Sequence, residues 1–132
     1  MATVGWQIYE PIGGLYKASV DGMAAATSGL STVISLKGYL LTNIIMPDTW
    51  TTAALSFLLS VDDGVTYNSF SDYGGEIAYT SSIAVASKAL GMKPEYAMQL
   101  QGLLKIRSGL AALAVNQASS RTITLIAMKL EK

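Results

Sequence analysis

The strongest constraint on the fold is a series of short runs of β-favouring residues, separated by turn residues, that begins near Val33. In the clearest run, residues 54–61, large apolar residues occupy alternate positions, as expected of a strand with one buried face. Asp62, Asp63 and Gly64 follow this run. Because Asp tolerates left-handed backbone and Gly adopts it freely, a hairpin is expected here, with residues 65–70 returning antiparallel.

Further strands are expected at residues 32–36, 39–46, 76–80, 103–107 and 121–129. In the last of these, Ile123, Leu125 and Ala127 share one face, while Ile126 and Met128 make the other face largely non-polar as well. A strand that is apolar on both sides is normally covered on both sides. The cover is either a loop of the same chain or a neighbouring subunit. The pattern as a whole predicts an all-β domain over residues 31–132.

Two segments interrupt the strand pattern. Pro94 suits the first turn of a helix, and the residues after it favour helix as far as residue 100, with Gly102 as the expected stop. Residues 82–90 mix strand formers with alanines, and we favour a strand there.

The first thirty residues differ from the rest, because aromatic and large apolar side chains alternate with glycines and Pro11. A disordered tail is normally poor in aromatics. Two interpretations remain open for residues 1–30: a docking arm, or a first strand on the chain's own domain. The candidate interface residues are Trp6, Ile8, Tyr9, Leu15 and Tyr16.

Missing residue types and low charge exclude several functions. The chain contains no Cys and no His, which excludes an imidazole base, a thiolate nucleophile and a Cys/His zinc site. Charged residues make up 14% of the chain, where about 25% is usual, and the net charge is zero. Neither nucleic acid nor an anionic membrane surface is an expected partner.

Membrane insertion is not expected either. The longest uncharged stretch, residues 22–36, has fifteen positions, fewer than a spanning helix needs. The first charged side chain is Glu10, so a basic leader is missing, and a product made in the cytoplasm is expected.

The acidic residues offer two candidate chemistries. Asp62, Asp63 and Asp72 are the nearest approach to a calcium loop, and carboxylate pairs among these, Asp48 and Glu76 are conceivable for glycoside hydrolysis. All five lie beside turn signals, where capping or solvated roles explain them. Ser87 and Lys88 are adjacent and would point apart on a strand. We therefore expect no catalytic residues, no cofactor and no metal.

Aromatic and arginine residues are candidates for binding. Trp50, Tyr67, Tyr73 and Tyr79 could line a sugar-binding face, although Trp and Tyr are equally favoured as interface anchors. Arg107 and Arg121 are interpreted as bidentate donors at a subunit or intersheet contact.

Most of the chain, residues 35–130, resembles small β-sandwich structural proteins of tailed bacteriophages, a group that includes jelly-roll capsid cement or decoration proteins. The resemblance is carried, in order, by LLTNIIMP at 40–47, WTTAALSF at 50–57, SVDDGVTY at 60–67, LKIRSG at 104–109, VNQA at 115–118 and RTITL at 121–125. It implies a jelly-roll-like sandwich in the virion that reinforces the capsid, commonly as a trimer.

Composition and resemblance together predict a non-enzymatic phage virion protein. It is expected to be all-β, a jelly-roll-like sandwich with one short helix and an N-terminal arm, and to form a homotrimer bound to the major capsid protein on the capsid surface. The alternative is a carbohydrate- or receptor-binding module of a phage tail or baseplate.

Overall fold

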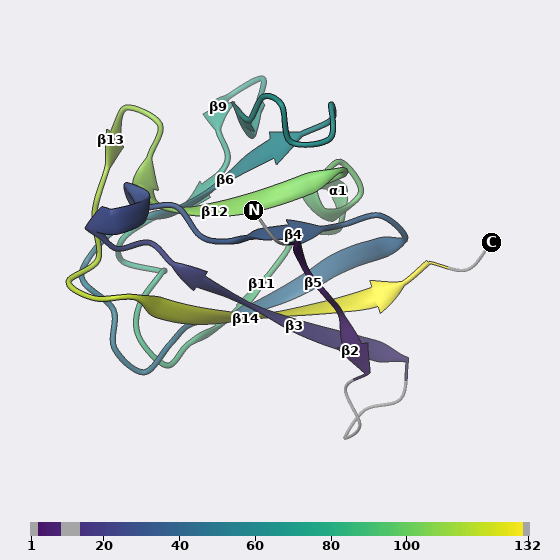
Figure 1. Ribbon diagram of the computed structural model, residues 1–132, viewed down its shortest axis with the longest axis horizontal. Helices are drawn as coiled ribbons and strands as arrows, with labels where there is room; N and C mark the ends of the chain where they lie inside the picture. The colour runs from purple at the N-terminus through teal and green to yellow at the C-terminus, as the bar shows by residue number, and fades with distance from the viewer. Residues whose placement is uncertain (1–2, 9–13, 131–132) are drawn as a thin grey trace.

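The computed structural model describes residues 3–8 and 14–130, and its fold is a β-sandwich of two sheets (Figure 1). The larger sheet has the order β1 (Thr3–Val4), β4 (Val33–Ser35), β12 (Leu103–Leu110), β6 (Leu55–Ser60) and β10 (Ala78–Tyr79), with β13 (Leu113–Ala114) paired to β12 and β7 (Asn68–Ser69) paired to β6. The second sheet has the order β11 (Ala89–Gly91), β5 (Tyr39–Ile45), β14 (Arg121–Lys129), β3 (Leu15–Gly22) and β2 (Gln7–Ile8). The predicted all-β class is confirmed.

Three short elements complete the fold. The strands β8 (Ser71–Asp72) and β9 (Gly75–Glu76) form a separate hairpin. The 3-10 helix η1 (Ala25–Thr27) follows β3, and the single short α-helix among the described residues is α1 (Pro94–Ala97). No helix in the described part of the chain has the length and apolar character needed to cross a membrane.

The core lies between the two sheets and comes from alternate positions of the long strands. In β6, Leu55 and Phe57 have no exposed surface, and in β14 the same is true of Ile123, Leu125 and Ala127. Strand alternation therefore predicted the buried face of β14 and the first half of that of β6. Over the rest of residues 54–61 the prediction was wrong, because Val61 is 86% exposed while Ser56 and Ser60 on the opposite face are buried. The other core side chains are contributed mainly by β3, β4, β5 and β12: Ala18, Val20, Ile34, Leu41, Ile44, Leu104 and Ile106.

The segment after β10 differs from the expected strand over residues 82–90. Only Ala89 and Leu90 of that range belong to a strand, and the residues before them form turns in which Ile83 N–H and Ala84 N–H both donate to Thr80 O. Ser87 adopts a positive φ of 60°, which is incompatible with a continuous strand. The expectation of a strand was wrong for most of the segment.

Two other elements are present but shorter than expected. The helix begins at Pro94 and ends at Ala97 rather than at residue 100. The return strand after the Asp62 hairpin is limited to β7, whose two residues pair antiparallel with Leu58 and Leu59.

Residues 3–8 cross from one sheet to the other. β1 pairs in parallel with β4 at the edge of the larger sheet, and β2 pairs antiparallel with β3 at the edge of the second sheet. Trp6 lies between the two pairings and packs against the core. In this chain the N-terminal segment therefore joins the two sheet edges at one side of the sandwich (Figure 1).

Gly102 allows β12 to begin close to the end of β6. Its φ is +83°, and a Cβ atom there would lie 2.2 Å from the backbone oxygen of Ser60. Gly38 has nearly the same φ, +82°, but open space where its Cβ would lie.

These two glycines separate backbone strain from steric contact. We expect Gly38→Ala to reduce the free energy of unfolding by about 1 kcal/mol, the cost of left-handed backbone. Gly102→Ala should reduce the free energy of unfolding by a further amount of about 1–3 kcal/mol, because the new Cβ displaces the Ser60 backbone. Urea unfolding of both variants measures the difference, and equal losses would contradict the close approach.

Candidate functional site

Trp6 and Tyr16, two of the predicted interface residues, meet at Tyr39. The Trp6 ring stacks on Tyr39 with a centroid separation of 5.0 Å, and Tyr16 meets the same ring edge-on at 5.5 Å. Trp6 Nε1 also donates to the backbone oxygen of Ser35 at 2.8 Å. Within this chain, Trp6 thus anchors the N-terminal segment to the domain.

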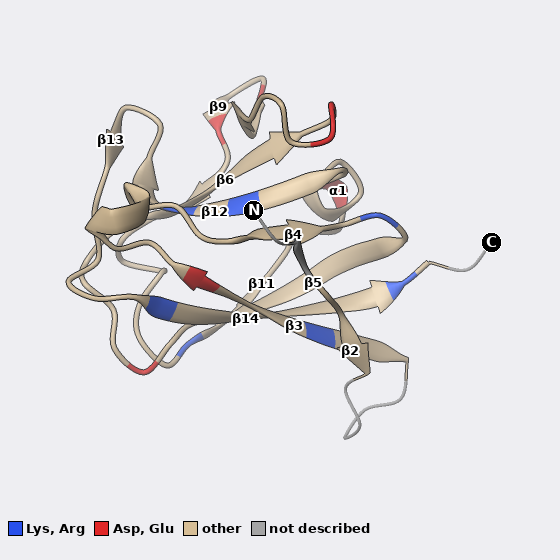
Figure 2. Ribbon diagram, viewed as in Figure 1, with Lys and Arg blue, Asp and Glu red and all other residues tan. Residues whose placement is uncertain are grey.

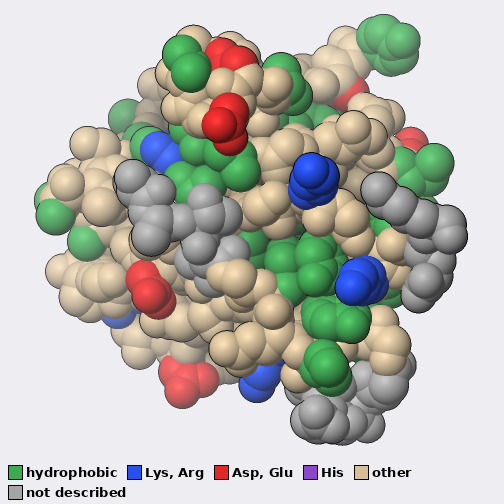
Figure 3. Space-filling model, turned by 45° about the vertical axis from the view of Figure 1, so that its right-hand side comes forward, with side chains coloured by type: hydrophobic (Ala, Val, Ile, Leu, Met, Phe, Trp, Pro, Cys, Tyr) green, Lys and Arg blue, Asp and Glu red, His purple; other side chains and the backbone are tan. Residues whose placement is uncertain are grey.

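The other predicted residues of the N-terminal segment lie nearer to solvent. Ile8 is 58% exposed and Leu15 is half-buried. Tyr9 lies outside the described residues. On the face shown in Figure 3, hydrophobic side chains gather where β2 and the last residues of β14 lie, with basic side chains beside them.

The outer face of the second sheet carries an apolar strip that crosses three neighbouring strands. Leu15 on β3 is directly opposite Met128 on β14, and Met128 is directly opposite Leu40 on β5. Met128 is 48% exposed, and the other two are half-buried. We call Leu15, Leu40 and Met128 the outer strip. The described chain leaves this part of β14 only partly covered, although Ile126 on the same face is buried.

Arg107 is buried inside the domain. Its side chain is 8% exposed and forms an ion pair with Glu76. Arg107 Nε donates to Ser56 Oγ at 2.9 Å and an amino group donates to Ser69 Oγ at 3.2 Å, while Glu76 also accepts from the Ala111 N–H. The network joins β6, β7, β9 and β12, and in this chain it occupies the Arg107 guanidinium that the sequence had indicated for a subunit or intersheet contact.

Arg121 belongs to a second network, centred on Gln117. Gln117 Oε1 accepts from Thr51 N–H at 2.7 Å and from Arg121 Nε at 3.2 Å, while Gln117 Nε2 donates to Thr51 O and to Ser108 Oγ. Arg121 also donates to Ser119 Oγ. The 3% exposed Gln117 side chain fixes the loop before β14, a role that nothing in the local sequence pattern indicated.

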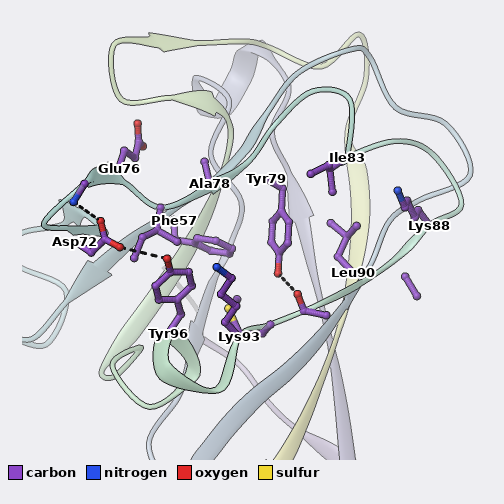
Figure 4. A pocket seen from close by; sticks show the side chains of 15 residues that line it. Phe57, Asp72, Glu76, Ala78, Tyr79, Ile83, Lys88, Leu90, Lys93 and Tyr96 are labelled. Carbon is purple, nitrogen blue, oxygen red and sulfur yellow. Dashed lines mark hydrogen bonds between the residues drawn. The ribbon is translucent and has the colours of Figure 1, made fainter.

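A groove opens between β10 and β11, the two sheet edges on the side opposite the N-terminal segment. It encloses about 600 Å³, which is within the size range of ligand sites. Its residues come from β6, the β8–β9 hairpin, β10, β11 and α1, and the principal side chains are Phe57, Asp72, Glu76, Tyr79, Ile83, Lys88, Leu90, Lys93 and Tyr96 (Figure 4).

Tyr79 crosses the middle of this groove. Its hydroxyl donates to the backbone oxygen of Gly91 at 2.6 Å, so a side chain from β10 reaches the backbone of β11 (Figure 4). Burial raises the pKa of Tyr79 to about 12, and the phenol stays a neutral donor at ordinary pH. On one side of Tyr79, the Tyr96 hydroxyl donates to Asp72, and Lys93 Nζ lies 5.4 Å from the Tyr96 ring centroid.

The four aromatics considered for sugar binding lie at separate places. Trp50 Nε1 donates to Ala53 O. The Lys105 ammonium lies over the Tyr67 ring, with Nζ 4.3 Å from the ring centroid, and Tyr73 is fully exposed. Of the four, only Tyr79 lines the groove.

Asp62 stabilises its own turn. One carboxylate oxygen accepts from Ser60 Oγ and Thr66 N–H, and the other from Thr66 Oγ1. The expected left-handed backbone is present at Asp63 and Gly64, with φ of 61° and 88°. Within residues 3–8 and 14–130, no three acidic side chains are grouped as metal ligands would be. Figure 2 likewise shows acidic and basic residues spread over several elements in that view.

Phe57, Leu90, Lys93 and Tyr96 are groove residues that sequence reasoning missed. Strand alternation indicated Phe57 as core, and no motif links it to the other three. Comparison with the models of known protein families, with curated proteins and with solved structures gives no match for this chain.

Breaking the Arg107–Glu76 pair tests its structural role. We expect Glu76→Ala to lower the free energy of unfolding by about 3 kcal/mol, because it leaves a buried guanidinium without its counter-charge. Glu95→Ala removes an exposed carboxylate on α1 and should change stability by less than about 0.5 kcal/mol. Chemical denaturation at pH 7 compares them, and similar losses would contradict this role.

The hydrogen bonds to Asp62 predict a pH-dependent turn. The Thr66 hydroxyl, the Thr66 N–H and the Ser60 hydroxyl lower the pKa of Asp62 to about 2 from an ordinary 3.8. Because the folded-state pKa is depressed, the contribution to stability is present above pH 3.8 and is lost as pH falls through about 2. Carboxyl NMR titration should give a midpoint near 2, raised by Thr66→Val and retained by Thr66→Ser. An unchanged midpoint in Thr66→Val would contradict the assignment.

Proposed function

We propose that this chain is a non-enzymatic structural protein of a phage virion, most simply a capsid cement protein that assembles with its own copies and with the major capsid protein. The observation that carries the proposal is the outer strip. It places three adjacent apolar side chains on the central strands of a sheet, where a monomer gains nothing from exposing them.

Low charge supports the same proposal. Charged residues are 14% of the chain, and large side chains such as Val61, Val65 and Leu113 are more than two-thirds exposed. A small domain normally uses charge to keep its surface from associating. Burial of these side chains against other subunits is consistent with a closed homo-oligomer, for which we propose a trimer.

The role on the capsid rests on the resemblance carried by residues 35–130. The polar side chains inside the domain have structural partners, such as Arg107 with Glu76 and Gln117 with Thr51, and this favours a scaffold over a catalytic role. The tail carbohydrate-binding alternative has less support, because its four aromatics are spread over the molecule and only Tyr79 lines the groove.

Self-association through the outer strip predicts the effect of a charge there. Light scattering with size exclusion at micromolar concentration should give about three times the 13.9 kDa chain mass for the unmodified protein. Met128→Asp should reduce this mass, because an interface would bury the new carboxylate. Ser19→Asp is the control, since Ser19 is exposed on the same face of β3, four residues from Leu15. A stable monomer of the unmodified protein contradicts the proposal.

The capsid assignment has its own test. Mass spectrometry of separated DNA-filled heads and tails should detect the protein in heads, and reconstruction of the particle should locate it on the shell. Its presence in tails alone would reject the cement role.

A further inference from the structure

We propose that β11 is a docking edge for an extended acidic peptide from a partner chain, which adds as a strand to the second sheet and places an apolar side chain in the groove. This binding mode goes beyond the virion role and does not depend on it. It rests on unused backbone groups, an apolar groove lining, an excess of positive charge and an internal precedent in the same fold.

The unused backbone groups follow from the register of β11. Its partner β5 bonds to alternate residues: Met46 N–H donates to Lys88 O, and Met92 N–H donates to Thr42 O. Because the backbone groups of an antiparallel strand point alternately to its two sides, those of Ala89 and Gly91 point away from β5. Both residues are exposed.

Three of these outward groups have no hydrogen-bond partner among the described residues: the N–H and carbonyl of Ala89 and the N–H of Gly91. The fourth, the Gly91 carbonyl, accepts from the Tyr79 hydroxyl. A strand-like peptide bonds through the same kind of ladder, so it satisfies the three free groups at once.

The groove beside this edge is suited to a peptide side chain. Ile83 is 43% exposed and Tyr79 and Met92 are half-buried, so an apolar group entering the groove meets these side chains, whereas Phe57 and Leu90 in the lining are buried core residues (Figure 4). The volume of about 600 Å³ is ample for one large side chain.

Charge selects an acidic peptide. Among the charged groove residues, Glu76 is paired with Arg107, whereas Asp72 accepts only from the neutral Tyr96 hydroxyl and Gly74 N–H and keeps its charge, so the two lysines leave an excess of one positive charge. The exposed Lys88 and Lys93 have no carboxylate partner in the described part of the chain. They flank β11 at its two ends, about 17 Å apart at about 3.4 Å per strand residue.

The opposite side of the sandwich provides the internal precedent. There, residues 3–8 pair with both sheet edges in extended conformation and insert Trp6 between them. At the β10–β11 side, residues 80–88 connect the ends of the two strands, and no described extended segment pairs with both of them; the described hydrogen bond between the two strands is the one from the Tyr79 hydroxyl to Gly91 O. The fold therefore accepts an extended segment with a central aromatic residue across one pair of edges and leaves the other pair available.

The probe is a fluorescent nine-residue peptide of alternating valine and threonine, with a central phenylalanine and one aspartate on each side, spaced about five residues apart. Fluorescence anisotropy should show saturable binding that weakens with salt. Amide exchange by NMR should show protection of the Ala89 and Gly91 N–H groups. A peptide with N-methyl groups on its bonding edge should bind at least about tenfold more weakly.

Variants separate the backbone edge from the groove. Ala89→Pro removes an N–H that β5 does not use, and should weaken peptide binding at least about tenfold with little change in melting temperature. Ala89→Ser keeps the N–H and should bind as the unmodified protein does. Tyr79→Phe frees the Gly91 carbonyl for a fourth hydrogen bond and should tighten binding by about fivefold.

Several results would overturn the proposal: no binding at millimolar peptide, equal binding of the N-methylated peptide, or protection confined to amides outside β11. Binding of hexagalacturonate in place of the peptide would assign the groove to an acidic sugar instead. If Ala89→Pro does not fold, Tyr79→Phe and the N-methylated probe still decide the question. A monomeric protein that binds the peptide would reject self-association and keep this inference.

Discussion

A sandwich of two open sheets has unpaired strand edges, and the fold of this protein is organised around how those edges are closed. At one side, residues 3–8 pair with two residues of β4 and with two residues of β3, so a single extended segment covers part of both edges. At the other side, β10 and β11 do not pair; residues 80–88 connect them, and the Tyr79 hydroxyl donates to the backbone of β11. An open edge invites pairing with another chain. The two sides of the same sandwich therefore differ in their capacity to bind a partner.

Buried polar groups fix how the strands near the open side are held. Ser56 and Arg107 are on paired positions of β6 and β12, and both are buried. A buried guanidinium is tolerated only where its donors are satisfied, and Arg107 pairs with Glu76. Because Glu76 belongs to β9, this ion pair also fixes the position of the β8–β9 hairpin against the larger sheet. The hairpin in turn supplies Asp72, which orients Tyr96 at the groove. The shape of the groove thus depends on a charge pair behind it.

Strand periodicity was sufficient to predict the all-β class and the strands β5, β6, β12 and β14, together with the buried face of β14. It left β3 open as an arm or a first strand, and it did not predict that Ser56 and Ser60 of β6 are buried while Val61 is exposed. It could not predict the path of residues 82–90, because alternating Ile83 and Val85 fit a strand, while three turn hydrogen bonds and a left-handed Ser87 determine the conformation. The groove could not be predicted from the sequence either. Its residues come from three separate parts of the chain, β6, residues 72–83 and residues 88–96, which the fold brings together. An aromatic such as Tyr96 has the same local pattern whether it lines a groove or covers the core.

The outer strip and the β11 edge differ in the groups that they expose, and each therefore suits a different kind of contact. The outer strip is a flat apolar area on a sheet whose backbone is already paired, so only side-chain burial is available there, and a matching surface on another copy fits that requirement. The β11 edge offers backbone donors and acceptors in a fixed direction, which a flat surface cannot use and an extended segment can. The two proposed contacts would use separate atoms of the chain, so each could form without competing with the other.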